Sequence, residues 1–179
     1  MEGFTLWFTG WSGAGKTTLA IAVESALKDY GVQYVQRLDG DIVRQDLTRD
    51  LGFSKEDRDE NIRRVTFVAE LLSKNGVATL VSFISPYREA RAIARSRCHN
   101  FIEIYMRCSP EILKERDVKG LYNKAQNQQI KNLTGIDDPY EKPVNPELII
   151  DSGKISIEDA RDIVLAALVE RNLICLRSQ

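Results

Sequence analysis

The sequence predicts an α/β fold with a parallel sheet, helices on both of its faces and a mobile lid. Strand-like and helix-like segments alternate along the 179 residues, which is typical of parallel sheets joined by crossover helices. Residues 77–84 are nearly all apolar, as expected of a strand that is buried on both faces. A glycine-rich turn at 10–15 stands between a predicted strand and a predicted helix. Such a turn presents backbone N–H groups to a ligand.

The first half of the chain contains two predicted strands and two predicted helices. Residues 4–9 are apolar, β-branched or aromatic, which predicts a buried strand, and apolar residues at helical spacing follow the glycine turn. Residues 33–38 predict a second strand, which leads into an acidic turn at 39–41. The stretch 57–75 has apolar residues on one helical face and ends at Gly76, a residue suited to a helix C-cap.

The second half repeats this alternation. Proline fits the first turn of a helix and serine fits the N-cap, so Pro86 and Ser109 predict where two helices begin. The predicted elements are a strand at 77–84, a helix from Pro86 to about 97, a strand at 101–106, a helix after Ser109, a strand at 148–150 and a helix at 156–171. The length predicts one domain, 1–179.

Residues 117–146 are the one region without clear periodicity. They combine glycines and prolines with several lysines, and a segment of this length inside a compact domain is usually a lid or a binding loop. A solvated linker is the alternative, but apolar residues such as Leu121 and Ile130 favour a lid. We predict a lid over about 117–135 that closes on transferring phosphates and excludes water.

The glycine-rich turn matches the phosphate-loop pattern G-x-x-x-x-G-K-[ST]. Its predicted ATP-binding residues are Gly10, Ser12, Gly13, Ala14, Gly15, Lys16, Thr17 and Thr18. Lys16 would reach the β- and γ-phosphates, and the Thr17 hydroxyl would hold Mg²⁺. A glycine turn that only begins a helix is the alternative, but the flanking strand and helix favour nucleotide binding.

Two carboxylates, Asp39 and Asp41, follow the second predicted strand. The carboxyl ends of parallel strands face the ligand crevice of an open sheet. One carboxylate there can belong to the metal shell while the other accepts a proton from an acceptor hydroxyl. A helix N-cap is an alternative role that is compatible with both. We expect Thr17 and Asp39 to hold the metal.

A second group of residues indicates a pocket for an anionic acceptor. Arg58 and Asn61 are three positions apart and share a helix face, and Arg44 lies three residues after Asp41. Guanidinium groups bind sulfate or phosphate through paired hydrogen bonds, and Phe53 could form an aromatic wall. A salt-bridged surface helix is the alternative, and the charge pattern alone leaves both open.

The absence of two motifs excludes some classes of phosphate-loop protein. The chain lacks the Asn/Thr-Lys-x-Asp pattern of GTPases, and its central strand ends in serine where a motor ATPase would carry an acid. These absences favour a kinase of a small acceptor. Kinases of nucleoside monophosphates or gluconate are the nearer alternative. A protein that senses or hydrolyses ATP without an acceptor is the more distant one.

The composition of the chain indicates which kinds of partner and location to expect. The 25 basic and 26 acidic side chains give a net charge of −1, which does not indicate a nucleic-acid or membrane-surface partner. No apolar run approaches the roughly 20 residues of a membrane span, and no signal-peptide pattern is evident. The three cysteines are scattered, so we expect reduced thiols and a cytoplasmic protein.

Along nearly its whole length, the chain resembles the adenylyl-sulfate kinase family, in its stand-alone bacterial form. The matching pieces are GWSGAGKTT at 10–18, LDGD at 38–41, GFSKEDRDENIRR at 52–64, SFISPYR at 82–88, RDVKGLY at 116–122 and TGIDDPYEKP at 134–143. The resemblance implies transfer of the γ-phosphate of ATP to the 3′-hydroxyl of adenosine 5′-phosphosulfate (APS). The product is 3′-phosphoadenosine 5′-phosphosulfate (PAPS), an intermediate of sulfate assimilation. The family also suggests a homodimer.

The resemblance also implies roles for individual residues. Asp41, Lys16 and Ser85 match catalytic positions, with Asp41 as the catalytic carboxylate. In bacterial members the serine at the Ser85 position has been labelled a phosphoserine intermediate, although direct in-line transfer needs no covalent relay. The positions that match acceptor contacts are Asp41, Arg44, Phe53, Arg58, Asn61, Ile84, Ser85, Lys119, Asn132 and Leu133.

The sequence departs from the family pattern at three positions. Gln126 replaces an arginine of the predicted lid, which removes one cation from it. Leu133 replaces a phenylalanine, so stacking on an adenine is lost while apolar contact survives. Trp11 stands where leucine is common, which we expect to alter packing only.

Overall fold

The computed structural model describes residues 2–117, 120 and 138–175. Most of the predicted lid at 117–135 lies outside the described residues, and so do Lys119, Asn132 and Leu133. The described part contains a sheet of five strands in the order β2-β3-β1-β4-β5, and every pair of neighbours is parallel. The strands are β1 (Phe4–Thr9), β2 (Val35–Asp39), β3 (Ala78–Ser82), β4 (Phe101–Arg107) and β5 (Leu148–Asp151).

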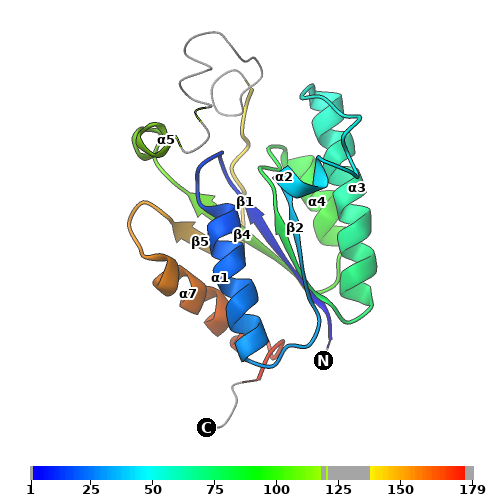
Figure 1. Cartoon of the computed structure of the whole chain (residues 1–179), viewed down its shortest axis with the longest axis vertical. Coiled ribbons are helices and arrows are strands. Elements are labelled where there is room, and N and C mark those ends of the chain that lie inside the picture. The colour runs from blue at the N-terminus through cyan, green and yellow to red at the C-terminus, as the bar shows by residue number, and fades with distance from the viewer. Residues whose placement is uncertain (1, 118–119, 121–137, 176–179) are drawn as a thin grey trace.

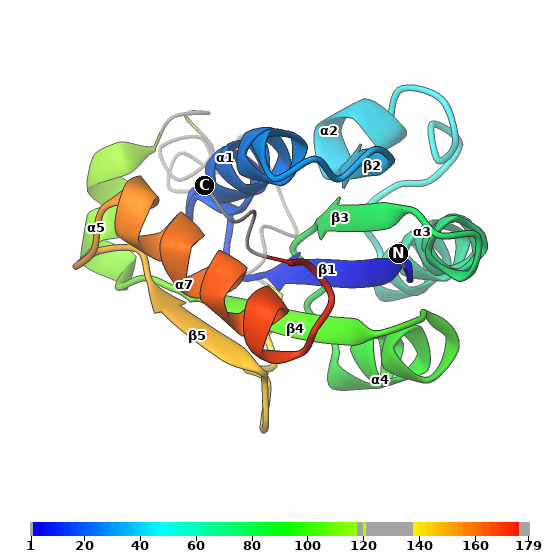
Figure 2. The same ribbon diagram turned by 90° about the horizontal axis from the view of Figure 1, so that it is seen from below.

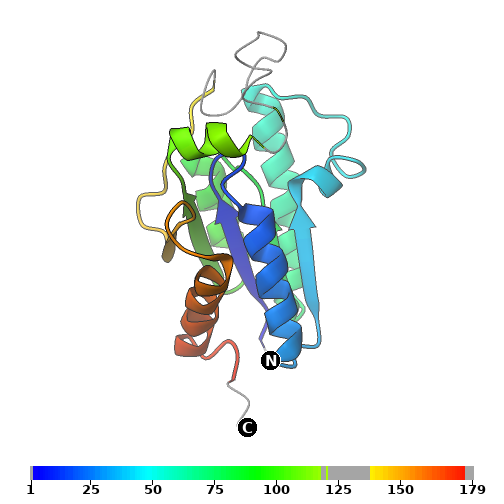
Figure 3. The ribbon, with the colours of Figure 1, turned by 60° about the vertical axis from the view of Figure 1, so that its left-hand side comes forward.

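Helices cover both faces of this sheet, as the sequence predicts. The helices are α1 (Lys16–Asp29), α2 (Gly40–Val43), α3 (Lys55–Lys74), α4 (Arg88–Arg97), α5 (Pro110–Arg116) and α7 (Ile157–Glu170). Helices α1 and α7 pack together on one face, and α3 and α4 pack together on the other (Figures 1 and 2). Figure 3 shows that α1 starts at the end of the sheet where the strands finish, close to α2 and α5.

The two faces of β1 explain this layering. Phe4, Leu6 and Phe8 belong to the apolar core under α1 and α7, while Trp7 belongs to a second core under α3 and α4. All four side chains are fully buried. Since neighbouring residues of a strand point to opposite faces, a continuous apolar run places one strand in two cores. This confirms the prediction of a buried central sheet.

The end of β3 differs from the sequence prediction. The strand ends at Ser82 instead of Ile84, and α4 begins at Arg88, with Tyr87 as its N-cap, instead of at Pro86. Ser85 lies in the turn between them with a φ of 45°. A residue in the left-handed conformation cannot continue a strand. The apolar run in the sequence therefore extends beyond the strand that it predicts.

Serine caps fix several helix starts. The hydroxyls of Ser54, Ser109 and Ser156 accept hydrogen bonds from backbone N–H groups three residues later. Each bond satisfies one of the N–H groups that the first turn of a helix leaves without a partner. In the described part of the chain, no helix is long and apolar enough to cross a membrane.

Candidate functional site

The phosphate loop connects β1 to α1 at the carboxyl end of the sheet. Gly10, Gly13 and Gly15 have φ values of 149°, 80° and 85°, which side chains rarely tolerate. A Cβ on Gly10 would lie 2.5 Å from the carbonyl oxygen of Met106. The loop therefore needs glycine both for its backbone conformation and for its close approach to β4.

Lys16 opens α1 and folds back over this loop. Its Nζ donates to the carbonyl oxygens of Gly10 at 2.9 Å and Trp11 at 2.7 Å. The residue is only 8% exposed, so the ammonium group is held close to the backbone of the loop. An ammonium in this position can bind a phosphate oxygen that occupies the loop.

Thr17 and Asp39, the two predicted metal ligands, meet directly. The Thr17 hydroxyl donates to Oδ2 of Asp39 at 2.7 Å, and Asp39 is buried at 5% exposure. The other carboxylate oxygen accepts from the backbone N–H of Asp41 at 3.0 Å, so Asp39 is also the N-cap of α2. The two roles considered for this acid from the sequence are therefore compatible in the structure.

Ser82 adds a buried hydroxyl to this corner. In the sheet register Ser82 pairs with Asp39 on β2 and with Phe8 on β1. Its Oγ is buried and has no hydrogen-bond partner within the described part of the chain. A buried hydroxyl without a partner costs free energy, so this atom fits a site where a bound group, such as a metal-held water, completes its hydrogen bonding.

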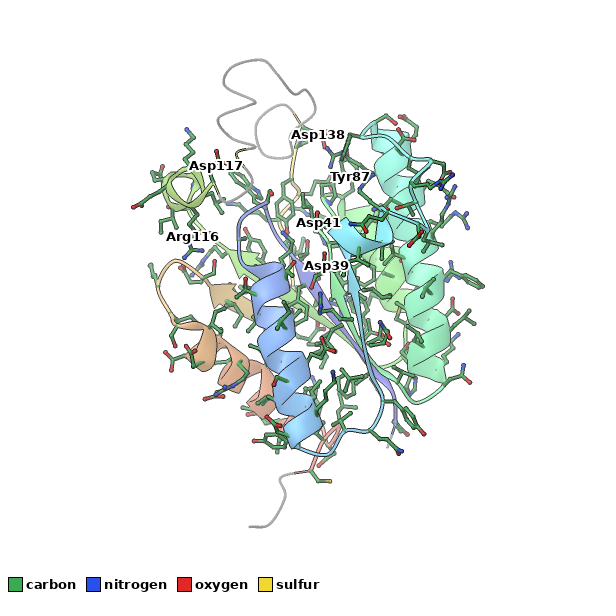
Figure 4. All side chains as sticks on the ribbon, viewed as in Figure 1. Asp39, Asp41, Tyr87, Arg116, Asp117 and Asp138 are labelled. Carbon is green, nitrogen blue, oxygen red and sulfur yellow. The ribbon has the colours of Figure 1, made fainter. Side chains whose placement is uncertain are left out.

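Asp41 lies in the first turn of α2 and is exposed. Figure 4 shows Asp39 and Asp41 toward the end of the molecule where Tyr87 and Asp138 also lie. An exposed carboxylate at this edge is accessible to a substrate hydroxyl, which fits the role predicted for it.

Two arginines and one aromatic ring form the predicted acceptor pocket. The guanidinium carbon of Arg44 lies 4.6 Å from the centre of the Phe53 ring, and that of Arg58 lies 5.8 Å from it. Burial, and after it the nearby charge of Arg58, lowers the pKa of Arg44. Two like charges around one ring repel each other, and an anion between them would relieve this repulsion.

Asn61 lies on the same helix as Arg58 and is also buried, at 5% exposure. Its Oδ1 has no hydrogen-bond partner in the described ranges. An amide oxygen in this state is ready to accept a hydrogen bond from a ligand. Arg58 and Asn61 are thus buried side chains of α3, while Arg63 and Arg64 of the same helix form ion pairs with Glu60.

A contact missed by the sequence analysis links this pocket to the segment that begins at 138. The Tyr87 hydroxyl donates to the Asp138 carboxylate at 3.1 Å, and Asp138 lies 3.4 Å from Nε of Arg58. The same Nε donates to the Phe53 carbonyl at 3.0 Å. Burial, and after it the hydrogen bond with Asp138, raises the pKa of Tyr87 to about 12, so this hydroxyl stays protonated as a donor.

Ile84 and Ser85 form the turn beneath Tyr87. The Ile84 carbonyl accepts from the Thr9 hydroxyl at 2.7 Å, which ties the turn to the end of β1. Ser85 is 2% exposed, and its Oγ accepts from the indole N–H of Trp7 at 3.0 Å. With the hydroxyl buried and bonded in this way, the geometry favours a structural role for Ser85 over that of a phosphate carrier.

The structure therefore brings together two sets of predicted residues. Lys16, Thr17 and Asp39 lie at the phosphate loop, while Arg44 and Arg58 lie around the Phe53 ring. Sequence reasoning did not single out Tyr87 or Asp138, although both lie inside motifs of the family pattern. The pairing of residues 51 positions apart was the missing information.

Comparison with known proteins shows the family of this chain. A family model described as adenylylsulphate kinase matches residues 2–151. An adenylyl-sulfate kinase of Halothermothrix orenii is 58% identical over 175 residues, which cover 98% of this chain and 94% of that protein.

Solved structures show the same relationship. The APS kinase of Mycobacterium tuberculosis, in complex with AMPPNP and APS, has a TM-score of 0.89 and 42% identity, and the match covers 93% of this chain and 98% of that one. A gluconokinase of Sinorhizobium meliloti has a TM-score of 0.62 at 17% identity, with 96% of this chain and 95% of that one covered, which shows a shared fold alone.

The phosphate loop yields a direct prediction. Gly10→Ala should weaken ATP binding by about tenfold or more and lower the free energy of unfolding by about 1–3 kcal/mol, because the new methyl group meets the Met106 backbone. Titration calorimetry with ATP and urea unfolding measure the two effects.

Gly13→Ala is the matched control for this variant. It carries an unfavourable φ of 80°, but its Cβ would make only an ordinary contact with Leu113 at 3.6 Å. It should therefore lose less stability than Gly10→Ala. Equal losses in the two variants would mean that the approach to Met106 is unimportant.

Proposed function

We propose how the residues of this site divide the work of catalysis, on the premise that the chain belongs to the adenylylsulphate kinase family. The enzyme is an adenylyl-sulfate kinase, which transfers the γ-phosphate of ATP to the 3′-hydroxyl of APS and forms PAPS. The observation that supports the proposed acceptor site is the cluster of Arg44 and Arg58 around the Phe53 ring. Cations around an aromatic wall suit a substrate that combines a purine with an anionic tail.

The donor half is the phosphate loop with Lys16. Its backbone N–H groups and the N-terminus of α1 face the phosphates of ATP. Lys16 exchanges its contacts with the Gly10 and Trp11 carbonyls for a phosphate oxygen and neutralises charge on the transferring group.

The metal in this half is Mg²⁺, which would neutralise the charge of the β- and γ-phosphates. Thr17 and Asp39 would hold it, since their 2.7 Å contact already places two oxygen atoms together. Two protein oxygens are a typical share for Mg²⁺, which keeps water and phosphate oxygens in its other positions. The buried Ser82 hydroxyl, without a partner in the described structure, fits a role beside that shell.

Asp41 acts on the acceptor. Its exposed carboxylate accepts a hydrogen bond from the 3′-hydroxyl of APS, orients it in line with the γ-phosphate and takes its proton during transfer. Its backbone N–H is fixed by Asp39, so the metal residue and the base are held by one short turn. Ser85 helps to shape the acceptor site and forms no covalent phosphoserine intermediate.

The acceptor is held by groups from three segments. Arg44 and Arg58 bind the phosphosulfate, Phe53 walls the adenine, and Asn61 supplies its amide oxygen. Ile84 and Ser85 form the floor. Lys119, Asn132 and Leu133, in a lid at about 117–135, cover the site, by resemblance to the family. We further propose one domain over 1–179, a homodimer and a cytoplasmic location.

A comparison of acceptors tests the function. With ATP present, APS should give a kcat/KM at least about a hundredfold above that of adenosine monophosphate or gluconate, because only APS combines an adenine for the Phe53 ring with a phosphosulfate for the arginine pair. A coupled assay of ADP release measures all three. Equal rates with APS and adenosine monophosphate would overturn the assignment, and ADP release without any acceptor would indicate an ATPase.

Asp41→Ala tests the base. The variant should lose about 10²–10⁴-fold in kcat while its affinity for ATP is unchanged, because the carboxylate acts on the acceptor alone. Asp46→Ala, another exposed acid shortly after α2, should keep the wild-type rate. Turnover retained by Asp41→Ala would rule out the proposed role.

Arg58→Ala tests the acceptor pocket. Loss of a charged hydrogen bond should weaken APS binding by about 1.5–3 kcal/mol, measured by calorimetry in the presence of a non-hydrolysable ATP analogue. Arg63→Ala is the matched control, since Arg63 lies on the same helix with 61% of its side chain exposed and pairs with Glu60. An equal effect of both substitutions would contradict the proposed pocket.

Thr17→Val tests the metal site without relying on turnover. Valine keeps the shape of the side chain and removes the hydroxyl. The gain in ATP affinity that Mg²⁺ produces in the wild type should fall by about tenfold, while binding of metal-free ATP changes little. An unchanged Mg²⁺ dependence in calorimetry would exclude Thr17 from the metal shell.

A further inference from the structure

Arg91 of α4 joins three separate segments of the chain. Its Nε donates to Oε1 of Glu103 on β4 at 2.7 Å, its Nη1 to the Ser85 carbonyl at 2.5 Å and its Nη2 to the Glu141 carbonyl at 2.6 Å. The guanidinium carbon also lies 5.7 Å from the centre of the Tyr140 ring. One side chain thus fastens both the turn after β3 and the segment beginning at 138 to the sheet.

The ion pair between Arg91 and Glu103 is deeply buried. The exposed fractions of the two side chains are 3% and 9%. Removing both charges from water costs about as much as their attraction returns, so a buried pair of this kind adds little net stability. The planar guanidinium instead supplies donors in fixed directions, which is suited to holding carbonyl groups in place.

One of those carbonyls belongs to a strained residue. Ser85 has a φ of 45° and precedes a proline, a position that normally favours extended backbone. A left-handed conformation of a residue other than glycine persists only where its surroundings enforce it. The surroundings here are Arg91 on the carbonyl and Trp7 on the hydroxyl.

The segments that Arg91 fastens are the ones that carry the acceptor pocket. Tyr87, two residues after Ser85, donates to Asp138, and Asp138 in turn lies beside Arg58. Close to Asp138 in the chain, the hydroxyl of Tyr140 is 2.9 Å from that of Thr9. The three hydrogen bonds of Arg91 given above end on the turn at Ser85, on the segment from 138 and on β4, and none of them goes to a residue of the phosphate loop.

We infer that Arg91 is a positioning residue for the acceptor half of the site: it holds Ser85 in its left-handed turn and the segment from 138 against it. Through them it aligns Asp138 with Arg58. This inference rests on the proposed function, because it assumes that Arg58 binds the acceptor.

Arg91→Lys is the central test. Lysine keeps the positive charge near Glu103 but lacks the planar fork that reaches both carbonyls. The KM for APS should rise by about tenfold or more, while the KM for ATP stays within about twofold of the wild-type value. A merely structural role would change both KM values or shift only the melting temperature. An equal change in both KM values, or no change in either, would overturn the inference.

Arg95→Lys is the matched control. Arg95 lies one turn further along α4 and also contacts Glu103, at 3.3 Å, but its other hydrogen bonds go to Glu147. Arg95 therefore belongs to the same charge network as Arg91, but the hydrogen bond to the Ser85 carbonyl comes from Arg91. Both KM values should stay within about twofold of wild type. A rise in the KM for APS equal to that of Arg91→Lys would assign the effect to the Glu103 charge network and contradict the inference.

Ser85→Gly tests whether Arg91 affects the KM for APS through the turn at Ser85. Glycine adopts a φ of 45° without strain, so Arg91→Lys should raise the KM for APS less in the Ser85→Gly background than in the wild type. An equal rise in both backgrounds would show that Arg91 does not act through this turn. Should Arg91→Lys fail to fold, Glu103→Gln carries the test, since it weakens the anchor of Arg91 and should raise the KM for APS alone.

Wild-type kinetics separate this inference from the proposed function. If the wild type shows no APS-dependent turnover, the proposed function fails. If the wild type is active with APS and Arg91→Lys leaves both KM values unchanged, only the positioning role fails.

Discussion

The register of the parallel sheet is the constraint on which the site depends. Phe8, Ser82 and Asp39 lie side by side on β1, β3 and β2. Because parallel strands end at the same edge, this register places the acidic turn after β2 at the same edge as the phosphate loop after β1, with β3 between the two strands. The 2.7 Å contact of Thr17 with Asp39 is the direct result. It couples the donor loop to α2, where the proposed base Asp41 lies, so the positions of these two parts of the proposed site depend on one another.

The second half of the site is assembled by contacts distant in sequence. Arg44 and Arg58 reach the Phe53 ring from the two sides of one connection between α2 and α3. Asp138 arrives from beyond β4 and binds Tyr87. A pocket built in this way is sensitive to the conformation of the turn at Ser85. Under the proposed function, the backbone conformation of Ser85 therefore matters more than its hydroxyl, which is already bonded to Trp7.

The donor half could be predicted from sequence because its information is local. Gly10, Lys16 and Thr17 lie within eight residues, and the motif specifies both the turn and the helix that follows it. The charge pattern alone did not decide whether Arg44 and Arg58 belong to an acceptor pocket or to a salt-bridged surface helix. The family resemblance favoured the pocket. Tyr87 and Arg91 were missed because their partners are up to 51 positions away and no periodicity reports such pairs. The predicted end of β3 was wrong because apolar residues continue past the point where the backbone turns.

We propose that the edge of one sheet unites a donor and an acceptor, so that phosphate passes directly from ATP to the 3′-hydroxyl. The most direct measurement is a single-turnover reaction with γ-labelled ATP and APS, followed by phosphorus NMR of the product and mass analysis of the protein. With direct transfer, we expect the label in a 3′-phosphate monoester on an intact phosphosulfate, with no label on the protein at any time. Label on Ser85 that decays as product forms, or label released as inorganic phosphate, would contradict it.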